Sequence, residues 1–362
     1  MNQQIRFCKS VDGTRIAYAQ SGTGPVLVKA PHWLTHLEYE WQSPIWKPWI
    51  ESLSRGHTLI RMDERGCGLS GTDMENVSLD AWVHDLEAVV DAADLERFAL
   101  FGHSQGSSIA VEYAARHPAR VSHLILLGSY ARGAMKRDLP PERIDELHAQ
   151  LKLIEAGWGR DDPSYRQMFS MQFMPGGSAE QLASMSELQR RSATPENAVR
   201  VIRSMFAIDV RPAAPLVQCP ALLLHARGDL RAPLAEGLLL ASLIPGARLV
   251  PLETANHILL PQEPAYRQFF DELEAFVPRA SGASAGGRTS LAPDSVFAQL
   301  TARETEVTER IAQGLDNAQI AAHLDMSEKT VRNHITHIFD KLLVENRPQA
   351  IVLARNHGFG NA

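Results

Sequence analysis

The stretch Gly102-His103-Ser104-Gln105-Gly106 decides how the larger part of this chain is interpreted. Residues 98–101 are apolar and typical of a strand, whereas residues 107–116 place apolar side chains at helical spacing. The pattern predicts a serine on a tight strand-to-helix turn, with glycines where the crowded backbone leaves no room for a side chain. Such a turn exposes the hydroxyl, so Ser104 is a candidate nucleophile, although these five residues also occur together by chance.

Two further polar residues follow predicted strands at positions from which they could reach Ser104. Asp229 comes after the predicted strand 221–225, and His257 comes after the predicted strand 248–252. The order Ser, Asp, His is the order in which this kind of sheet presents a nucleophile, an acid and a base. His257 would take the proton of Ser104, and Asp229 would hold the ring and stabilise its charged form. A structural role for each residue singly is the alternative.

The loop at residues 31–36 is the expected place for an oxyanion hole, since it follows a predicted strand. Backbone N–H groups build such a hole, and those of Trp33 and Gln105 are the candidates. His32 and His36 either face a ligand or are simply solvated. We expect a ligand pocket beside the serine to be lined by His32, Trp33, His103, Met168, Phe169 and Phe173.

Strand and helix patterns alternate through most of the first 277 residues. The alternation predicts an α/β fold with a largely parallel sheet covered by helices on both faces, and a ligand site at the carboxyl ends of the strands. From about residue 131 to 215 only helices are indicated, so we interpret this insertion as a cap over the site. Its aromatic and methionine side chains suit an adaptable lining for an apolar ligand. Alternatively, they form the small core of the insertion itself.

The composition is that of an ordinary globular protein, with 44% hydrophobic and 22% charged residues and a net charge of -6 over 362 residues. Cys8, Cys67 and Cys219 are far apart and lack metal-ligand spacing. We therefore expect no disulfide framework, no metal site and no cofactor. No apolar run is long enough to span a bilayer, and the start lacks the pattern of a signal peptide. We expect a cytoplasmic protein with no membrane partner.

Residues 1–277 resemble the α/β-hydrolase family. The resemblance rests on four motifs: Asp63-x-Arg65-Gly66-x-Gly68-x-Ser70, Gly102-His103-Ser104-Gln105-Gly106, Gly228-Asp229 and Asn256-His257. It implies hydrolysis of an ester, lactone, thioester, amide or carbon-carbon bond as a class, because the fold accepts many substrates. The fold also includes receptors that keep the triad and bind a small molecule. The His-Gly pair usual in the oxyanion loop is replaced here by Pro31-His32.

A second unit follows a stretch rich in glycine, serine and alanine at residues 278–297, which we interpret as a flexible linker. Residues 298–362 predict an all-α, four-helix domain. Its first helix opens with a capping-box pattern from Thr301 to Glu304, and Ser327 is the expected N-cap of the third helix. Short helices joined in this way are typical of a helix-turn-helix that places one helix in the major groove of DNA.

The outward face of the third helix carries donors for phosphates and base edges. The candidate DNA-binding residues are Lys329, Thr330, Arg332, Asn333, His334, Thr336, His337 and Lys341. Residues 300–362 hold seven Lys and Arg against eight Asp and Glu, so DNA affinity must depend on a local patch and should be modest for one copy. A helical protein-interaction module with a solvated polar face is the alternative.

The same segment resembles the LuxR family of helix-turn-helix regulators. The matching motifs include Leu300-Thr301-x-Arg303-Glu304, Asn317-x-x-Ile320-Ala321, Ser327-x-x-Thr330-Val331-x-x-His334 and Lys341-Leu342-x-Val344-x-x-Arg347. The resemblance implies that Arg332, Asn333 and Thr336 face bases, with Lys329, Thr330 and His334 nearer the phosphates. It also implies that the last helix, at residues 348–356, forms the face of a homodimer.

These observations predict a transcriptional regulator in which the hydrolase-like domain binds, and either hydrolyses or merely senses, a small apolar or aromatic carbonyl or ester ligand. The expected partners are double-stranded promoter DNA, the small-molecule ligand and a second copy of the chain. A signal response such as quorum sensing is the expected context. The rival interpretation is an active serine esterase whose helical C-terminal domain serves oligomerisation or tethering.

Overall fold

A computed structural model describes residues 2–72, 74, 76–158, 160, 162–277 and 296–360. The predicted linker at residues 278–297 lies outside the described residues, except for its last two positions. These two positions belong to a short 3-10 turn, η3 (Val296–Gln299). Within the described residues, no helix combines the length and the apolar character needed to cross a membrane.

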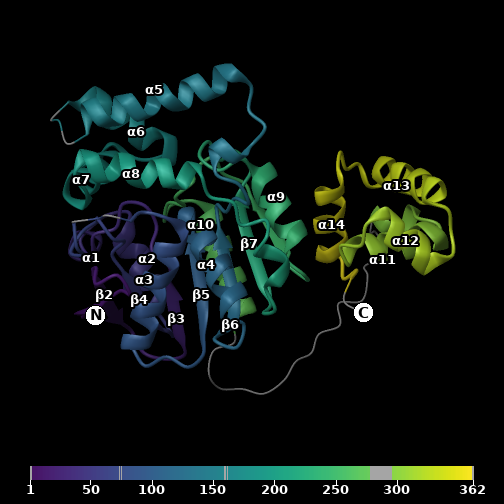
Figure 1. Cartoon of the computed structure of the whole chain (residues 1–362), viewed down its shortest axis with the longest axis horizontal. Helices are drawn as coiled ribbons and strands as arrows, with labels where there is room; N and C mark the ends of the chain where they lie inside the picture. Colours follow the sequence, from purple (N-terminus) through teal and green to yellow (C-terminus); the bar gives the residue numbers. More distant parts are fainter. Residues whose placement is uncertain are drawn as a thin grey trace.

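An eight-stranded sheet organises the first part of the chain (Figure 1), in the order β1-β2-β4-β3-β5-β6-β7-β8. The first two strands are antiparallel to their neighbours, and β3 to β8 run parallel. The strands are β1 (Gln4–Lys9), β2 (Arg15–Ser21), β3 (Val26–Lys29), β4 (Thr58–Met62), β5 (Phe98–His103), β6 (Val121–Leu127), β7 (Ala221–Ala226) and β8 (Arg248–Leu252). The sheet predicted from sequence is therefore confirmed.

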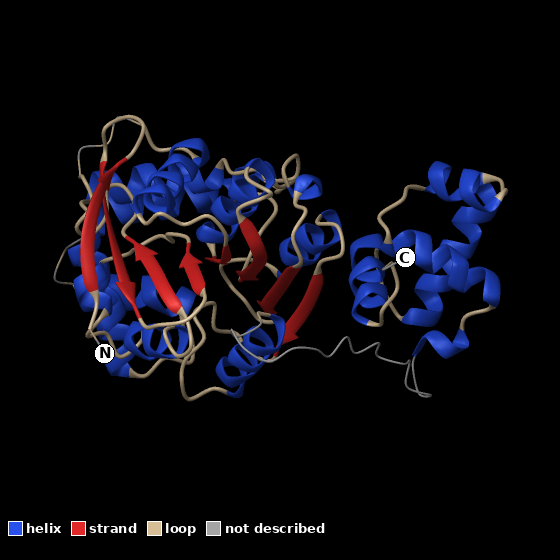
Figure 2. Cartoon of the chain, turned by 90° about the horizontal axis from the view of Figure 1, so that it is seen from below, coloured by secondary structure: helices blue, strands red, loops and turns tan. Residues whose placement is uncertain are grey.

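Helices cover both faces of this sheet (Figure 2), as its composition requires. Every residue of β5 and β7 is buried, so neither face of these strands can meet water. The covering helices are α1 (Leu37–Glu40), α2 (Trp46–Leu53), α3 (Leu79–Ala92), α4 (Gln105–Arg116), α9 (Leu234–Leu243) and α10 (Pro264–Phe276). Trp49 of α2 packs on Phe101 of β5 and on Phe269 of α10, which fixes two helices to the central strands.

The insertion forms four helices that lie over one end of the sheet (Figure 1). They are α5 (Pro141–Gly157), α6 (Pro163–Phe173), α7 (Ala179–Ser192) and α8 (Pro195–Phe206). Backbone N–H groups of His257 and Ile258 both donate to the carbonyl of Phe173, which ties the end of α6 to the loop after β8. The cap is thus held directly against a predicted catalytic residue.

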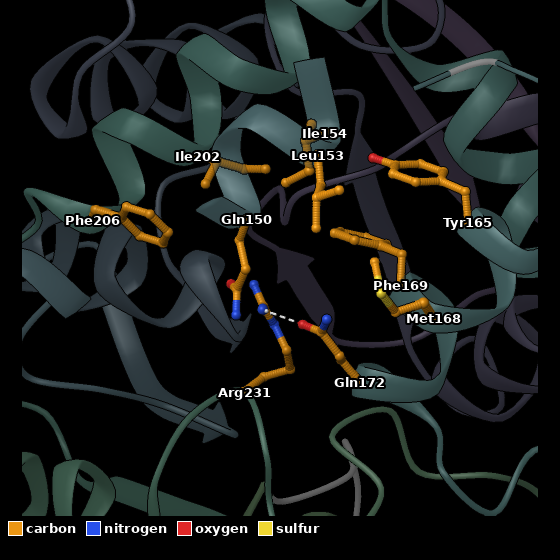
Figure 3. A pocket seen from close by; sticks show the side chains of 10 residues that line it. All are labelled: Gln150, Leu153, Ile154, Tyr165, Met168, Phe169, Gln172, Ile202, Phe206 and Arg231. Carbon is orange, nitrogen blue, oxygen red and sulfur yellow. Dashed lines mark hydrogen bonds between the residues drawn. The ribbon is translucent and has the colours of Figure 1, made fainter. Parts of the chain in front are cut away.

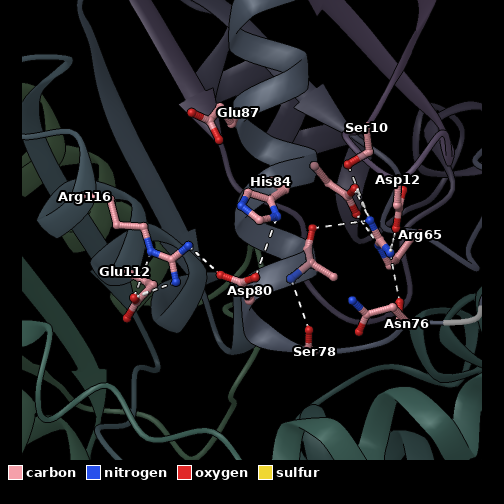
Figure 4. Close-up of polar contacts among 12 residues, drawn as sticks. Ser10, Asp12, Arg65, Asn76, Ser78, Asp80, His84, Glu87, Glu112 and Arg116 are labelled. Carbon is pink, nitrogen blue, oxygen red and sulfur yellow. Dashed lines mark hydrogen bonds and ion pairs between the residues drawn. The ribbon is translucent and has the colours of Figure 1, made fainter.

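Arg65, from the first family motif, joins four separate segments (Figure 4). Its guanidinium forms a buried ion pair with Asp85 of α3 and a second pair with Asp12 in the β1–β2 turn. It also donates to the carbonyl of Asn76 and, at 3.5 Å, to Ser10 Oγ. Because both partners of the Arg65–Asp85 pair are buried, removing either would leave an uncompensated charge. This motif is therefore structural.

The C-terminal unit is a bundle of four helices with its own apolar core. The helices are α11 (Ala302–Ala312), α12 (Asn317–Leu324), α13 (Glu328–Leu342) and α14 (Arg347–Asn356). The predicted capping box of Thr301 and Glu304 is present, and Ser327 caps α13. The inner face of α13 packs into the bundle through three buried residues, Val331, Ile338 and Leu342. The opposite face is left for solvent or a partner.

The last helix, α14, packs on the hydrolase-like part of the chain (Figure 1). Arg355 Nη1 donates to the carbonyls of Ala241 and Ile244, at the end of α9. The Asn356 side chain pairs with both backbone groups of Leu249, on the outer edge of the last strand. Val352 is buried in the same contact. The helix expected to form a dimer face is therefore covered within the chain along this side.

Candidate functional site

Ser104 lies between β5 and α4 in a backbone conformation that few residues adopt, with φ of 55° and ψ of -123°. The glycines on either side are required by close contacts. A Cβ on Gly102 would lie 2.5 Å from Ser107 Cα, and a Cβ on Gly106 would lie 2.5 Å from the carbonyl oxygen of Pro31. The second contact also presses the turn against the loop after β3. The strain is thus imposed by the surrounding packing, as expected for a functional turn.

His257 and Asp229 are joined by a short hydrogen bond, 2.6 Å between Nδ1 and Oδ2, with both side chains buried. The other carboxylate oxygen accepts the backbone N–H groups of Arg231 and Ala232. Burial alone would raise the pKa of Asp229, but His257 and these N–H donors outweigh it and lower the pKa. Gly128 makes room for the pair, because a Cβ there would lie 2.8 Å from His257 Cε1.

Ser104 and His257 line the same cavity, but no hydrogen bond joins their side chains. His257 Nε2 is buried and, among the described residues, has no hydrogen-bond partner. Catalytic hydrogen bonds are often long in a ligand-free protein and tighten when the substrate is bound. The arrangement is therefore a formed acid–base pair facing a nearby hydroxyl.

The candidate oxyanion donors lie on two elements that touch each other. Trp33 belongs to the loop after β3, and Gln105 is the first residue of α4, where a backbone N–H has no partner within its helix. The side chain of Gln105 is fixed by Glu64, whose Oε1 accepts from Nε2 at 2.8 Å. Burial raises the pKa of Glu64 to about 8. A mainly neutral carboxyl therefore holds Gln105 near pH 7.

Two small cavities surround this centre. The first has a volume of about 390 Å³ when the space open to solvent is included, and it is lined by His32, Trp33, Leu34, Trp46, His103, Ser104, Phe173, Met185, Met205, Arg231, His257 and Ile258. The second lies within the cap, has a volume of about 370 Å³ counted in the same way, and is lined by Gln150, Leu153, Ile154, Tyr165, Met168, Phe169, Gln172, Ile202, Phe206 and Arg231 (Figure 3). Of the six predicted pocket residues, Met168 and Phe169 line the cap cavity instead of the cavity beside the serine.

The loop histidines serve different purposes. His32 is buried, its Nδ1 lies 3.0 Å from the carbonyl of Trp33, and burial lowers its pKa well below the usual value. His103 is buried too, with its pKa lowered by burial, and its Nε2 lies 3.1 Å from the carbonyl of His257. Both rings are therefore neutral near pH 7. His36 instead caps α1 by accepting from the N–H of Tyr39, so neither a ligand-facing nor a merely solvated role describes it.

The predicted DNA-binding residues lie mainly on the exposed side of α13. Those that are exposed are Lys329, Thr330, Arg332, Asn333, Thr336 and His337, whereas His334 is half-buried. Arg332 lies 3.6 Å from Glu328, one turn earlier, and this weak pair leaves most of the guanidinium accessible. The face can thus present cations and amides to a polyanion without breaking strong contacts within the bundle.

Lys341 differs from the other predicted DNA-binding residues. Its Nζ donates to Glu304 Oε2 at 2.6 Å, and this hydrogen bond lowers the pKa of Glu304 to about 2. The lysine therefore connects α13 to the start of α11. Because Glu304 already compensates the charge of Lys341, we do not propose Lys341 as a DNA contact. The spacing along α13 could not reveal this, since Glu304 lies on a different helix.

Sequence reasoning missed Arg231 and Glu64. Arg231 lines both cavities, and its Nη1 donates to Gln172 Oε1 of the cap (Figure 3). Only its position two residues after Asp229 could have indicated a place near the site. Glu64 lies within the turn motif after β4, where a variable position gave no signal. Among the described residues, no cluster of histidine, cysteine and carboxylate side chains is suited to hold a metal ion.

Family models match two parts of the chain. The α/β hydrolase fold model matches residues 38–264, and the model of bacterial regulatory proteins of the luxR family matches residues 298–354. The first match spans more than half of the chain and contains all three predicted triad positions. The second contains the whole of α13.

Individual proteins support the first match. The AB hydrolase superfamily protein YisY of Bacillus subtilis is 27% identical over 255 residues, which cover 69% of this chain and 91% of that protein. The pimeloyl-acyl-carrier-protein methyl ester esterase of Nitrosomonas europaea is 26% identical and covers 66% of this chain, with 90% of its own length matched.

A solved structure agrees. The enol-lactonase from Burkholderia xenovorans LB400 superposes with a TM-score of 0.56 at 26% identity, over 75% of this chain and 99% of that one. The fold, the strained turn at Ser104 and the family matches lead to one conclusion: the chain belongs to the α/β-hydrolase family and carries, fused at its C-terminal side, a DNA-binding domain of the luxR family of bacterial regulatory proteins.

Proposed function

We propose that this protein is a transcriptional regulator whose hydrolase domain binds a small ester or lactone and thereby changes the affinity of the luxR-type domain for promoter DNA. One observation supports the coupling most directly. The loop that contains Asp229 and Arg231 leads into α9, and the end of α9 accepts two hydrogen bonds from Arg355 of α14. A single helix therefore runs from the ligand cavity to the DNA-binding domain.

The chemistry at the cavity follows from the arrangement of its groups. Ser104 Oγ would attack the ligand carbonyl while His257 Nε2 takes the hydroxyl proton, and Asp229 would stabilise the imidazolium that forms. Backbone N–H groups of Trp33 and Gln105 would stabilise the oxyanion. The proton then passes to the leaving oxygen, and water repeats the sequence to release the acid. The names methyl ester esterase and enol-lactonase, carried by two relatives, favour an ester or lactone.

Ligand binding can alter DNA affinity only if the two arrangements of the domains bind the ligand unequally. The contact between α14 and α9 gives the protein one such arrangement, in which Val352 and Arg355 are buried against the hydrolase domain. In the alternative arrangement this side of α14 would be free to meet a second copy. We therefore propose a homodimer as the DNA-binding form, with dimerisation competing against the packing seen in the single chain.

The regulator proposal is tested by selecting duplexes from a random pool with the full-length protein and measuring their affinities at several salt concentrations. We expect a selected duplex to be bound at least about 1000-fold more tightly than unrelated DNA. Equal affinity for all duplexes, with the same salt dependence, would remove the regulator proposal.

The coupling is tested with Asn356→Ala, which removes the hydrogen bonds to Leu249 without touching the α13 face. We expect the two domains of the variant to unfold in two separate calorimetric transitions, whereas in the parent they unfold more cooperatively. The free energy of unfolding should fall by about 1–2 kcal/mol. His323→Ala is the control, since this side chain is exposed and its hydrogen bond is to the carbonyl of Gln319 in the same helix. Unchanged unfolding of Asn356→Ala would show that the contact does not join the domains.

The runner-up is an active serine esterase whose C-terminal domain only tethers or oligomerises it. The preformed His257–Asp229 pair favours turnover and is compatible with either proposal. The two proposals separate on DNA binding, because only the regulator requires sequence-specific recognition.

A further inference from the structure

A third, larger cavity opens beside Ser104 and is rich in positive charge. It encloses about 1000 Å³, including its open mouth, and extends between the cap and the loop before α9. Its charged lining residues are Arg137, Arg143 and Arg231, and within the described part of the chain no aspartate or glutamate lines it. Arg143 forms an ion pair with Glu146 and Arg137 lies 3.8 Å from Glu236, so Arg231 is the lining cation without a carboxylate ion-pair partner among the described residues.

Arg231 occupies the junction of this cavity with the two smaller ones. Its guanidinium donates to Gln172 Oε1 at 2.9 Å and lies over the ring of Phe173, 4.8 Å from the centroid. Among the described residues, no carboxylate lies within ion-pairing distance of this side chain. Burial lowers its pKa from the usual value. The side chain is half-buried and its direct partners are neutral, while Asp229 raises its pKa only from a longer distance, so a ligand carboxylate would supply the direct counter-charge.

The nearest acids are already engaged. Asp229 accepts from His257 and from two backbone N–H groups, so its charge belongs to the proposed triad. The Glu236 carboxylate accepts hydrogen bonds from the backbone N–H and from the guanidinium of Arg132. Arg137 Nε also lies 3.8 Å from Glu236 Oε1. Neither carboxylate forms an ion pair with the Arg231 guanidinium, and Asp229 stabilises its charge only from a longer distance.

We propose that the ligand of this domain carries a carboxylate in addition to its ester or lactone carbonyl, and that Arg231 binds this carboxylate while the carbonyl lies at Ser104. Arg137, at the wall of the large cavity, is partly compensated by Glu236, so the proposal rests on Arg231. The inference rests on the proposed function of the Ser104 site and names its substrate class. It differs from the sequence expectation of a purely apolar or aromatic ligand, because the charged lining comes from segments distant in sequence.

The geometry of the guanidinium suits this role. One of its terminal nitrogens is used by Gln172, which leaves other N–H groups for a two-point contact with a planar carboxylate. Gln172 belongs to α6 of the cap, so the same interaction fixes the arginine to the element that covers the site. Carboxylate binding would then also strengthen the closure of the cap over the ligand.

The proposal is tested with matched 4-nitrophenyl esters of linear dicarboxylic acids of four to eight carbons, the second carboxyl being either free or a methyl ester. The readout is the ratio of kcat/KM for the free acid to that for the methyl-capped compound. In the wild-type protein we expect this ratio to reach about tenfold or more at the best chain length. In Arg231→Gln this ratio should fall close to one. The ratio of Arg231→Lys should lie between those of the wild type and Arg231→Gln.

Arg211→Gln is the matched control, because Arg211 is exposed, pairs with Asp209 and lines none of the three cavities. It should keep the wild-type ratio. Melting temperatures of all variants show whether each is folded, and Arg231→Lys keeps the test meaningful if the glutamine variant is unstable. A wild-type ratio near one, or a ratio that Arg231→Gln leaves unchanged, would overturn the proposal.

Calorimetric binding of the same compounds to Ser104→Ala separates this proposal from the proposed function. Preferential binding of the free acids without turnover in the wild type would count against hydrolysis and support the carboxylate site. Turnover of both compounds at equal efficiency would support the esterase chemistry and reject the site. Binding of neither compound would overturn the carboxylate proposal, whereas DNA recognition is measured independently of all these results.

Discussion

The site around Ser104 and the outer face of α13 use polar residues in opposite ways. Near Ser104 several polar groups are buried and hydrogen-bonded to one another, as in His257 with Asp229 and Gln105 with Glu64, although His257 Nε2 has no partner among the described residues. On α13 the corresponding groups are exposed, and Arg332 has only a loose contact with Glu328. The first region is arranged before any ligand arrives, whereas the second keeps its donors free for a partner.

This difference agrees with what each region is proposed to bind. A developing oxyanion is stabilised best by dipoles that need no rearrangement, so a hydrolytic site gains from fixed hydrogen bonds in a dry cavity. A DNA duplex presents a dense row of charges and base edges, and side chains that meet it must not be committed elsewhere. The two halves of the molecule therefore predict different responses to mutation.

The largest effect is expected from Ser104→Ala. If the buried region acts as a nucleophilic centre, hydrolysis of a small 4-nitrophenyl ester should fall by roughly 10⁴-fold or more in kcat, because attack then depends on water alone. Steady-state kinetics measure this directly. Ser122→Ala, a half-buried serine on β6, is the control and should retain activity. Activity that persists in Ser104→Ala would place the reaction elsewhere.

The next effect is expected on α13. Changing Arg332 and Asn333 together to alanine should weaken binding of a selected duplex by about 10- to 100-fold or more, since each base contact contributes on the order of 1–3 kcal/mol. Fluorescence anisotropy at fixed salt gives the comparison. Arg267→Ala removes an equal charge from an exposed position on α10 and should leave the affinity as it was. Equal losses in both variants would indicate a general charge effect.

A smaller effect, dependent on pH, is expected from Glu64→Gln. Burial raises the pKa of Glu64 to about 8, above its ordinary value of 4.5. Its stabilising contribution is therefore complete below about pH 4.5 and is lost as pH rises towards 8. Glutamine does not titrate, so the variant should gain stability relative to the parent as pH increases through this window. Thermal unfolding of both proteins between pH 5 and 8 measures this change in relative stability. If the difference in stability between variant and parent is the same at every pH, Glu64 does not titrate in this range.

The smallest effect is expected from Lys341→Gln. The pair with Glu304 is partly exposed, so its loss should cost no more than about 1 kcal/mol of stability and leave DNA affinity nearly unchanged. The depressed pKa of Glu304 means that this contribution is present above about pH 4.5 and disappears as the pH falls towards 2. Urea unfolding at pH 7 and pH 3 compares the two proteins. A large loss of DNA affinity in Lys341→Gln would show that Lys341 does contact DNA.

The sequence was sufficient for most of the fold because the elements have clear local signals. Mostly apolar runs such as residues 221–226, in which His225 is the exception, mark buried parallel strands, and the capping box at Thr301 marks the start of α11. The short helices α1 and α2 were not assigned. Their segment is dominated by aromatic residues, whose burial depends on distant partners such as Phe269.

Only those residues of the candidate site that belong to sequence motifs could be predicted. Ser104, Asp229 and His257 each follow a recognisable strand, so their convergence could be inferred from topology. The environment of Arg231 could not, because Gln172 and Phe173 come from the cap, far away in the sequence. The pairing of Lys341 with Glu304 was hidden for the same reason. Long-range partners decide whether a charged residue is free, and local patterns do not contain them.

The central claim, that the occupied cavity changes DNA affinity, is tested most directly by filling the cavity covalently. The full-length protein is treated with an alkyl fluorophosphonate, which labels an activated serine, and its affinity for a selected duplex is compared with that of untreated protein. We predict a change of about fivefold or more, absent in Ser104→Ala treated in the same way. Complete labelling of Ser104 with an unaltered affinity at every salt concentration would contradict the account.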